Sequence, residues 1–261
     1  MKYFLDTEFL EGTQNKNFLG FIYGKTKSTI DLISIGIVSE DGREYYAISK
    51  DFNLKEAWNR YDIKIEWYSI DESNQSTRDI KVYWIRDNVL KPIYNELVQR
   101  WALEEEKANQ VLCTTGYNSP IKFSYKNFKR LLNKYGKTNK QIAEDIKQFC
   151  TINEFSGRGL IEQIVPSIPD TINRGIKFYG YYSDYDWVCF CWLFGKMIDL
   201  PNGFPMFAFD IQQQIEEYKI DKEQLLKEVP QISCHNALQD AIWNKKAYNW
   251  IQNEIKDRNN R

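Results

Sequence analysis

The chain of 261 residues lacks several features that mark common protein classes. No apolar run approaches the roughly 18 residues that a membrane-spanning helix requires, so we expect no transmembrane segment and no membrane partner. The N-terminus lacks the apolar core of a signal peptide, because Asp6 and Glu8 interrupt it, and this predicts a cytoplasmic protein. The formal net charge is −1, so no overall positive field indicates binding to nucleic acid.

Cysteine and histidine are also few. None of the five cysteines belongs to a Cys-x-x-Cys pair, and their odd number predicts reduced thiols. His235 is the only histidine, and it directly follows Cys234. A nucleophilic pair of these two residues is disfavoured, because adjacent side chains point apart and no acid follows at a place suited to orient the imidazole.

The first predicted strand carries two acids in an otherwise apolar segment. Lys2 to Phe9 is rich in aromatic and branched residues, and strand alternation places Phe4, Asp6 and Glu8 on one face. Two carboxylates side by side at the end of a buried strand repel each other and are costly to bury. A divalent metal ion held by oxygen ligands is the simplest neutralising group, so we expect further carboxylates elsewhere in the chain.

The order of the predicted elements indicates an α/β fold with a mixed sheet. Strands are predicted at Lys2–Phe9, Thr29–Ser39 and Arg43–Ser49, with a turn at Asp41-Gly42, which makes an antiparallel start. A further strand is predicted at Gly175–Tyr181. Residues 62–79 are polar and receive no assignment. Helices are predicted at 54–61, 82–90, 94–107, 128–135, 139–150, 184–197, 209–218, 222–228 and 236–256, with loops at 10–27 and 151–174.

Residues 107–143 contain eight positive side chains and no acid. Apolar residues in this range follow the spacing of an amphipathic helix, at Phe128, Leu131, Leu132 and Tyr135. Two interpretations stay open. The helix presents either an ordinary solvated face or a local patch that contacts phosphates, in which case Lys126, Lys129 and Arg130 are candidate substrate-binding residues.

Two later places offer further carboxylates. Asp184 and Asp186 lie where the strand at 175–181 turns into a helix, a position at which ligands often bind in α/β sheets. Asp184 can equally cap that helix. Asp240 lies in an apolar helical segment, where a charge requires a partner, and His235 precedes it by five residues. A single histidine at a helix start also has a purely structural interpretation, as a cap or a buried hydrogen-bonded side chain.

These motifs occur in the order that is typical of the DEDDh 3′–5′ exonucleases, and the chain resembles that superfamily. Its first motif is Asp6-Thr7-Glu8, its second Tyr185-Asp186, and its third runs from His235 to Asp240. The second motif departs from the usual Asn-x3-Phe-Asp spacing, which leaves Asp184 as a lesser candidate. The segments YFLDTEF, DLISIGIVSEDGREYYAIS and YDWVCFCWLFG are similar to the compact bacterial 3′–5′ exoribonuclease subfamily.

The resemblance covers residues 1–60, 84–92, 140–150 and 175–255, and it implies a ribonuclease H-like fold. In that fold the first three strands are antiparallel, later strands are parallel, and helices flank the sheet. We therefore expect a single domain over 1–261. Residues 107–174, a basic helical part and then a loop-rich connection, are predicted to be an insertion within it.

The resemblance also implies a metal-dependent catalytic site. Asp6, Glu8, Asp186 and Asp240 are expected to hold two Mg²⁺ or Mn²⁺ ions. The resemblance implies that Asp6, Glu8 and Asp240 would hold the first ion, that Asp6 would bridge to the second, and that Asp186 would hold the second directly or through water. His235 is expected to take the proton from the attacking water.

The implied activity is that of a 3′–5′ exoribonuclease, which releases nucleoside 5′-monophosphates from the 3′ ends of RNA. Phe9 and Leu10 are expected to pack on the terminal nucleotide, and Trp187 is either a further substrate contact or a core residue. The expected partner is RNA, or single-stranded or 3′-overhang nucleic acid, and a homodimer is a further expectation. A DNA exonuclease with the same site and a nucleic-acid-binding module without turnover are the alternatives.

Overall fold

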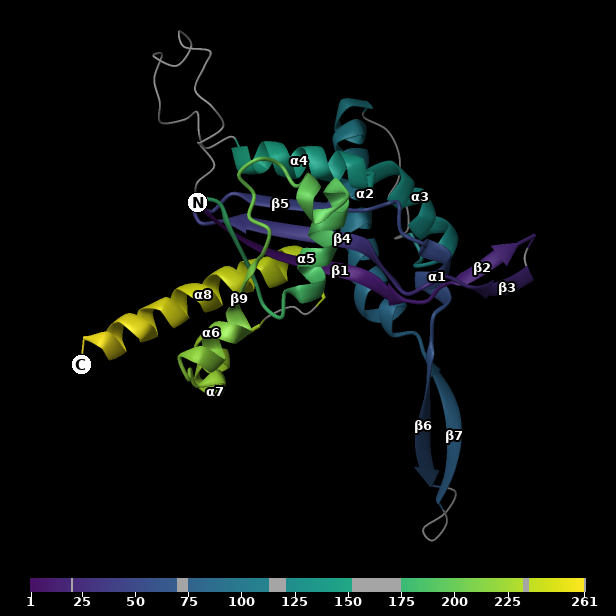
Figure 1. Ribbon diagram of the computed structural model, residues 1–261. Helices are drawn as coiled ribbons and strands as arrows, with labels where there is room; N and C mark the ends of the chain where they lie inside the picture. The colour runs from purple at the N-terminus through teal and green to yellow at the C-terminus, as the bar shows by residue number, and fades with distance from the viewer. Residues whose placement is uncertain (20, 70–74, 113–120, 152–174, 232–234, 261) are drawn as a thin grey trace. The chain divides into compact units, whose positions relative to one another are not determined.

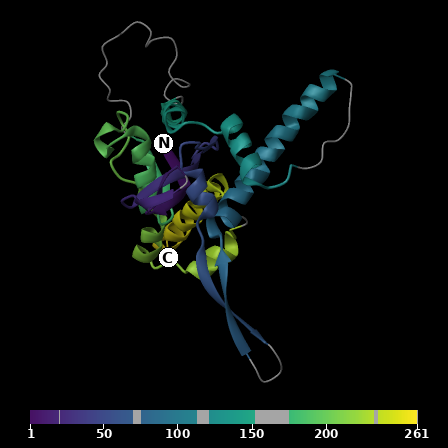
Figure 2. The same ribbon diagram turned by 90° about the vertical axis from the view of Figure 1, so that its right-hand side faces the viewer.

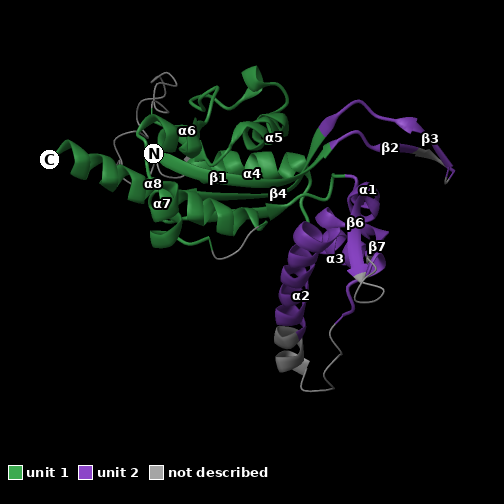
Figure 3. Ribbon diagram, turned by 90° about the horizontal axis from the view of Figure 1, so that it is seen from below, with its two compact units in different colours: residues 1–11, 30–52, 136–261 green, residues 12–29, 53–135 purple. Residues whose placement is uncertain are grey.

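The computed structural model describes residues 1–19, 21–69, 75–112, 121–151, 175–231 and 235–260 (Figure 1). The chain divides into two compact units (Figure 3). Unit 1 consists of residues 1–11, 30–52 and 136–261, and unit 2 consists of residues 12–29 and 53–135. The predicted insertion at 107–174 contributes to both units, and its status as an insertion in a single domain stays a prediction. None of the described helices is both long and apolar enough to span a bilayer.

Unit 1 is built on a five-stranded mixed sheet, which confirms the predicted α/β architecture. The strand order is β5 (Glu44–Ile48), β4 (Thr29–Ser39), β1 (Lys2–Gly12), β8 (Lys177–Gly180) and β9 (Phe209–Asp210). β4 and β5 are antiparallel, and the backbone N–H of Glu40, just beyond β4, donates to the carbonyl of Lys2 at the start of β1. β8 is parallel to both β1 and β9. The predicted antiparallel start is therefore confirmed.

Helices cover both faces of this sheet, because alternate residues of β1 are apolar on both sides. Tyr3 and Leu5 pack under α4 (Asn139–Thr151) and α5 (Asp184–Phe194). Phe4 lies on the opposite face, in a core with residues of α6 (Ile211–Glu217), α7 (Lys222–Glu228) and α8 (Ala237–Asn259). Asp6 and Glu8 follow Phe4 in the alternation, so they point toward the layer that contains α8. The described cysteines of unit 1 are buried and free, at Cys150, Cys189 and Cys191.

The first turn of α8 lies directly against β4. A Cβ atom at Gly36 would come within 2.2 Å of the carbonyl oxygen of Ala237 and 2.4 Å of the Cα of Leu238. No side chain fits at that separation, since such a contact is far inside van der Waals distance. Glycine at position 36 therefore sets how closely α8 approaches the sheet.

Unit 2 contains two separate hairpins and a small helical core. β2 (Asn15–Phe18) pairs with β3 (Phe21–Lys25), and β6 (Asp62–Ser69) pairs with β7 (Gln75–Val82) as a long twisted ribbon (Figure 2). The core helices are α1 (Leu54–Asn59), α2 (Lys91–Leu112) and α3 (Tyr125–Tyr135). Aromatic rings join these helices, at Trp58, Tyr94, Phe123 and Phe128.

Several predicted elements of this region are wrong. Where a loop is predicted at 10–27, β1 continues to Gly12, and residues 15–18 and 21–25 form the β2–β3 hairpin. Val82 ends a strand instead of starting a helix. The predicted break at Pro92 is absent, because the π-helix η1 (Arg86–Leu90) continues directly into α2. There the N–H of Lys91 donates to the carbonyl of Arg86, five residues back, and this wider turn accommodates a proline that has no N–H.

The other predicted elements differ mainly at their ends. The helix predicted at 184–197 ends at Phe194, before Gly195 with φ 112°, and a short 3-10 turn, η4 (Met197–Asp199), follows. Residues 209 and 210 form β9, so α6 begins only at Ile211. The amphipathic helix at 128–135 is confirmed within α3. The connection predicted at 151–174 lies almost entirely outside the described residues.

We expect Gly36→Ala to lower the free energy of unfolding by about 1–3 kcal/mol or more, because the new methyl group forces α8 away from β4. The measurement is chemical denaturation. Gly175→Ala is the matched control, since its Cβ would lie 3.6 Å from the nearest atom, and its change should stay within about 0.5 kcal/mol. Equal stability of the two variants would contradict the close approach.

Candidate metal centre

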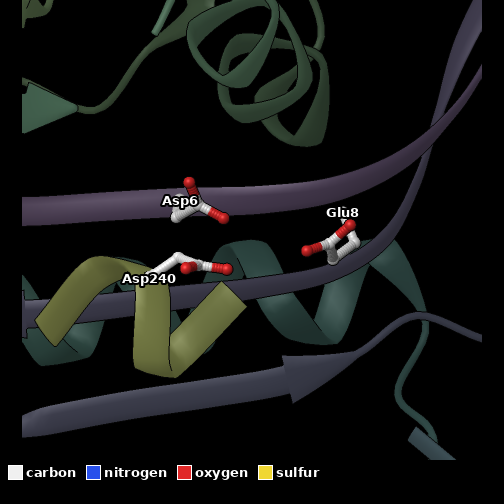
Figure 4. A group of neighbouring side chains, drawn as sticks. All are labelled: Asp6, Glu8 and Asp240. Atoms are coloured by element: carbon white, nitrogen blue, oxygen red, sulfur yellow. The ribbon is translucent and has the colours of Figure 1, made fainter. Parts of the chain in front are cut away.

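Three carboxylates meet between β1 and α8. Asp6 and Glu8 extend from β1, Asp240 extends from the first turn of α8, and all three point toward a common space (Figure 4). One oxygen from each carboxylate lies within 4.8 Å of the other two. Glu8 and Asp240 are buried, and Asp6 is partly buried. Among the described residues, this is the group of three or more possible ligand side chains that lie close enough together to hold a metal ion.

The end of β8 explains how other elements reach β1 here. The pairing of β1 with β8 ends at Phe4 with Tyr179, and β1 continues beyond it. Leu5 and Thr7 are two residues apart, so their backbone groups point to the same edge of β1. At that edge the buried Asn244 side chain donates to the carbonyl of Leu5 at 2.9 Å. Asn244 is one helical turn after Asp240, so this bond holds the Asp240 face of α8 against the strand.

A fourth carboxylate occupies the next position of the same edge. The backbone N–H of Thr7 donates to Oδ1 of Asp186 at 2.9 Å, and the Thr7 hydroxyl donates to the same oxygen at 2.5 Å. Asp186 is buried in the first turn of α5, whereas Asp184 is exposed. The N-cap of this helix is Ser183, so the alternative that Asp184 caps it is wrong. In a longer β8, a backbone carbonyl could have accepted the hydrogen bond from the N–H of Thr7. Asp186 accepts that bond instead.

Asp240 is oriented by the segment that precedes α8. Its Oδ1 accepts from the Gln231 amide at 2.7 Å, and its Oδ2 accepts from the backbone N–H of Asn236 at 3.1 Å. Asn236 is the N-cap of α8, and its own side chain accepts from the N–H of Gln239. These bonds fix both carboxylate oxygens of Asp240 while burial raises its pKa.

Burial and mutual repulsion raise the pKa values of the other acids. The pKa of Asp6 is raised well above its usual range by burial, and then by the charges of Asp186, Asp240 and Glu8. Burial and then the charges of Asp240 and Asp186 raise the pKa of Glu8 to about 8. For Asp186, burial raises the pKa to about 6, although the two hydrogen bonds from Thr7 favour its charged form. Without a cation, the four carboxylates cannot all be ionised at neutral pH without cost.

His235 lies immediately before the cap of α8, in the left-handed conformation with φ 65°. The side chain and backbone of His235 lower the pKa of Asp240, so His235 lies close to the acidic cluster. His235 lies before the first residue of α8, so helical periodicity does not fix its direction relative to Asp240. A non-glycine residue with positive φ stores strain, and such strain is often found at functional sites.

The three residues predicted to contact the terminal nucleotide differ in how exposed their side chains are. Phe9 is partly buried and meets the half-exposed Tyr185 ring edge-on, with centroids 5.8 Å apart. Leu10 is fully buried, so it is not available to pack on a substrate. The substrate role predicted for Trp187 is likewise replaced by its core interpretation, because its indole stacks on Phe190 and its Nε1 donates to the carbonyl of Met206.

The predicted phosphate contacts belong to unit 2. Lys126, Lys129 and Arg130 are exposed on α3, whose buried side is formed by Phe128 and the two leucines that follow. Their exposure fits both the solvated-face and the phosphate-contact interpretation, so their role stays a prediction.

Known proteins offer a distant match. No protein-family profile matches the chain. It is similar to two proteins from Mycobacterium tuberculosis, both named 3′-5′ exoribonuclease, one from strain CDC 1551 / Oshkosh and one from strain ATCC 25618 / H37Rv. Each is 24% identical to this chain over 217 residues, which are 83% of this chain and 75% of the relative. The match supports a relationship to 3′–5′ exonucleases at low sequence identity.

The sequence alone did not indicate the residues that hold the acids in place. Thr7, Asn244 and Gln231 each bond to a carboxylate or to β1 beside one. Of the three, only Asn244 could have been predicted from the sequence, since it is a polar residue one turn from Asp240 on an apolar helix face. Thr7 reads as an ordinary strand residue, because its role arises only where β8 ends.

The raised pKa of Glu8 makes the stability of the cation-free protein depend on pH. An unfolded glutamate titrates near 4.5, whereas folded Glu8 titrates near 8, so the folded state retains a proton that the unfolded chain has lost. The free energy of unfolding should therefore fall as pH rises from about 4.5 to about 8. Chemical denaturation in EDTA across this range measures it.

Glu8→Gln should flatten this pH dependence, because the variant cannot ionise at that position. The exposed Glu44→Gln is the matched control and should follow the wild type. Parallel curves for Glu8→Gln and the wild type would show that Glu8 is not desolvated as described.

Proposed function

We propose that the chain is a metal-dependent 3′–5′ exoribonuclease that releases nucleoside 5′-monophosphates from RNA 3′ ends. The observation that carries this proposal is the group of Asp6, Glu8 and Asp240, whose oxygens lie within 4.8 Å of one another. Acids on a strand and a helix far apart in sequence are brought together, and buried, at a cost that a bound divalent cation would offset. The similarity to proteins named 3′-5′ exoribonuclease supports RNA as the polymer.

The arrangement of elements supports a ribonuclease H-like fold. A central β1 lies between the antiparallel β4 and the parallel β8, with helices on both faces. In this proposal the catalytic acids come from the central strand and from the helices that pack on its two faces.

The donor set fits Mg²⁺ or Mn²⁺, because these ions bind carboxylate oxygens. Asp6, Glu8 and Asp240 would hold one ion, and Asp186 with Asp6 would hold a second. Bound cations would neutralise the carboxylates and stabilise negative charge on the phosphate during hydrolysis. The chain itself supplies rigidity, since Thr7 fixes Asp186 and Gln231 fixes Asp240.

His235 is the proposed general base, which accepts a proton from the attacking water on an imidazole nitrogen. It is within electrostatic range of Asp240 and is partly exposed, so it can pass that proton on to solvent. Phe9 and Tyr185 are the rings proposed to contact the terminal nucleotide, since they lie together at the start of α5. A 3′–5′ DNA exonuclease with the same residues is the second candidate.

We expect Asp240→Asn to reduce RNA hydrolysis at least about 100-fold, because the amide keeps the shape but loses the charge that a cation requires. The assay follows shortening of a 5′-labelled single-stranded RNA with Mn²⁺, beside a DNA of the same sequence. Asp257→Asn is the matched control, since Asp257 is exposed on the same helix. Full activity in Asp240→Asn would exclude the proposed site, and faster loss of the DNA would favour the second candidate.

We expect His235→Asn to lower kcat by about 10²–10⁴-fold, which is the usual contribution of a general base. Asparagine tolerates the left-handed backbone at this position, so the fold should survive. The rise in thermal stability on adding Mn²⁺ should stay as in the wild type, because the carboxylates are intact. A kcat within about threefold of the wild type would show that His235 has no catalytic role.

A further inference from the structure

The β2–β3 hairpin of unit 2 has an unusual surface. All five residues of β3 are exposed, and so is Leu19 in the turn before it. Phe21, Ile22 and Tyr23 are 64–78% exposed, a degree normal for lysine but not for large apolar side chains. An isolated two-stranded hairpin is marginally stable in water. A bound partner would offset the exposure of these side chains.

The charge of the hairpin indicates which partner. Lys16, Lys25 and Lys27 are all exposed, and residues 12–30 contain no Asp or Glu. In the whole chain 36 acids balance 35 bases, so this excess is local. A second copy of the chain docked symmetrically on the hairpin would bring the same lysines together, whereas a polyanion would neutralise them.

The strand pairing also singles out Tyr23. The register passes from Asn17 opposite Ile22 to Lys16 opposite Gly24, so Tyr23 is the extra residue of a β-bulge. Bulges re-aim side chains and are common beside functional surfaces. Exposed aromatic rings interleaved with lysines form the kind of platform on which bases of a single strand stack.

A polar cleft adjoins the foot of the hairpin within unit 2. It has a volume of about 480 Å³, and Lys25 belongs both to its wall and to β3. Donors and acceptors line it, among them Asn15, Asn59, Arg60 and Tyr61. Arg60 is held by the carboxylate of Glu56 and the carbonyl of Thr13. Lys25 therefore joins the hairpin to a cleft of nucleotide size, in which Lys25 and Arg60 are accompanied by the acids Glu56 and Asp62.

We propose that the β2–β3 hairpin and this cleft bind single-stranded RNA, as a second contact made by residues other than the carboxylate cluster. Phe21 and Tyr23 stack on bases, and Lys16, Lys25 and Lys27 contact phosphates. The choice of RNA rests on the proposed exoribonuclease function, whereas single-strand binding rests on the hairpin itself.

The test measures binding separately from hydrolysis. A fluorescein-labelled 20-nucleotide single-stranded RNA is titrated in EDTA, where no cation-dependent cleavage takes place, and fluorescence anisotropy gives Kd at several salt concentrations. Phe21→Ser/Tyr23→Ser should weaken binding at least about tenfold. Lys16→Gln/Lys25→Gln/Lys27→Gln should reduce the slope of log K against log salt by about 2, since each phosphate contact of a single strand contributes about 0.7.

Matched controls come from the rest of unit 2. Ile65→Ser/Trp67→Ser changes equally exposed apolar residues on β6, and Lys55→Gln/Lys64→Gln/Lys91→Gln removes three other exposed lysines. Both should bind as the wild type does. Unchanged binding and slope in the hairpin variants overturn the proposal. So does a shift from dimer to monomer in light scattering with RNA binding intact, because a second copy then occupies the hairpin.

A measurement on the wild type covers the case of variants that do not fold. Ultraviolet crosslinking of a 4-thiouridine RNA should label residues 15–27, and labels only elsewhere overturn the proposal. Hydrolysis of a trinucleotide with Mn²⁺ is followed in parallel. Hairpin-dependent binding without hydrolysis would refute the exoribonuclease and keep this contact, and hydrolysis without hairpin dependence would do the reverse.

Discussion

Strand β1 continues past the last paired residue of its neighbour β8, so the backbone groups along that edge need other partners. Side chains from two helices supply them. Asn244 of α8 donates to the carbonyl of Leu5, and Asp186 of α5 accepts from the N–H of Thr7. Because β8 ends at this point, acids on α5 and α8 can approach Asp6 at the uncovered edge of β1. The tight contact of Gly36 with the first turn of α8 fixes the same approach from β4.

This arrangement concentrates negative charge where burial makes it costly. Asp6 is surrounded by Asp186, Asp240 and Glu8, and each of the three raises its pKa. The hydrogen bonds from Thr7 to Asp186 and from Gln231 to Asp240 orient these acids but come from uncharged groups, so they do not neutralise them. Repulsion among the carboxylates therefore lowers the stability of the cation-free protein. A bound divalent cation would remove this repulsion, and the same repulsion would strengthen binding of the cation.

Patterns local in sequence predicted the parts of this site that depend on a single element. Alternation along β1 was enough to place Asp6 and Glu8 on one face, and an acid in an apolar helix was enough to single out Asp240. The predicted substrate contacts depend on burial, which is set by residues that are distant in sequence and close in space. Trp187 and Leu10 are suitable by type for substrate contact, but the packing of α5 and β1 buries them.

The two hairpins of unit 2 show a different limit of prediction. β6 has alternating apolar residues at Ile63, Ile65 and Trp67, but its partner β7 has no such pattern, and every residue of β3 is exposed. Alternation marks a strand because one face is normally buried, so hairpins with exposed apolar residues escape the usual pattern. The proposed RNA contact accounts only for the exposure of Phe21, Ile22 and Tyr23 in the β2–β3 hairpin.

Diffraction can test directly whether the carboxylate cluster is a cation site. Crystals soaked in Mn²⁺ should show an anomalous peak that contacts oxygens of Asp6, Glu8 and Asp240, at about 2.2 Å from each ligating oxygen. Ordered carboxylates with no peak between them at millimolar Mn²⁺, or a peak only elsewhere, would contradict a cation site at the carboxylate cluster.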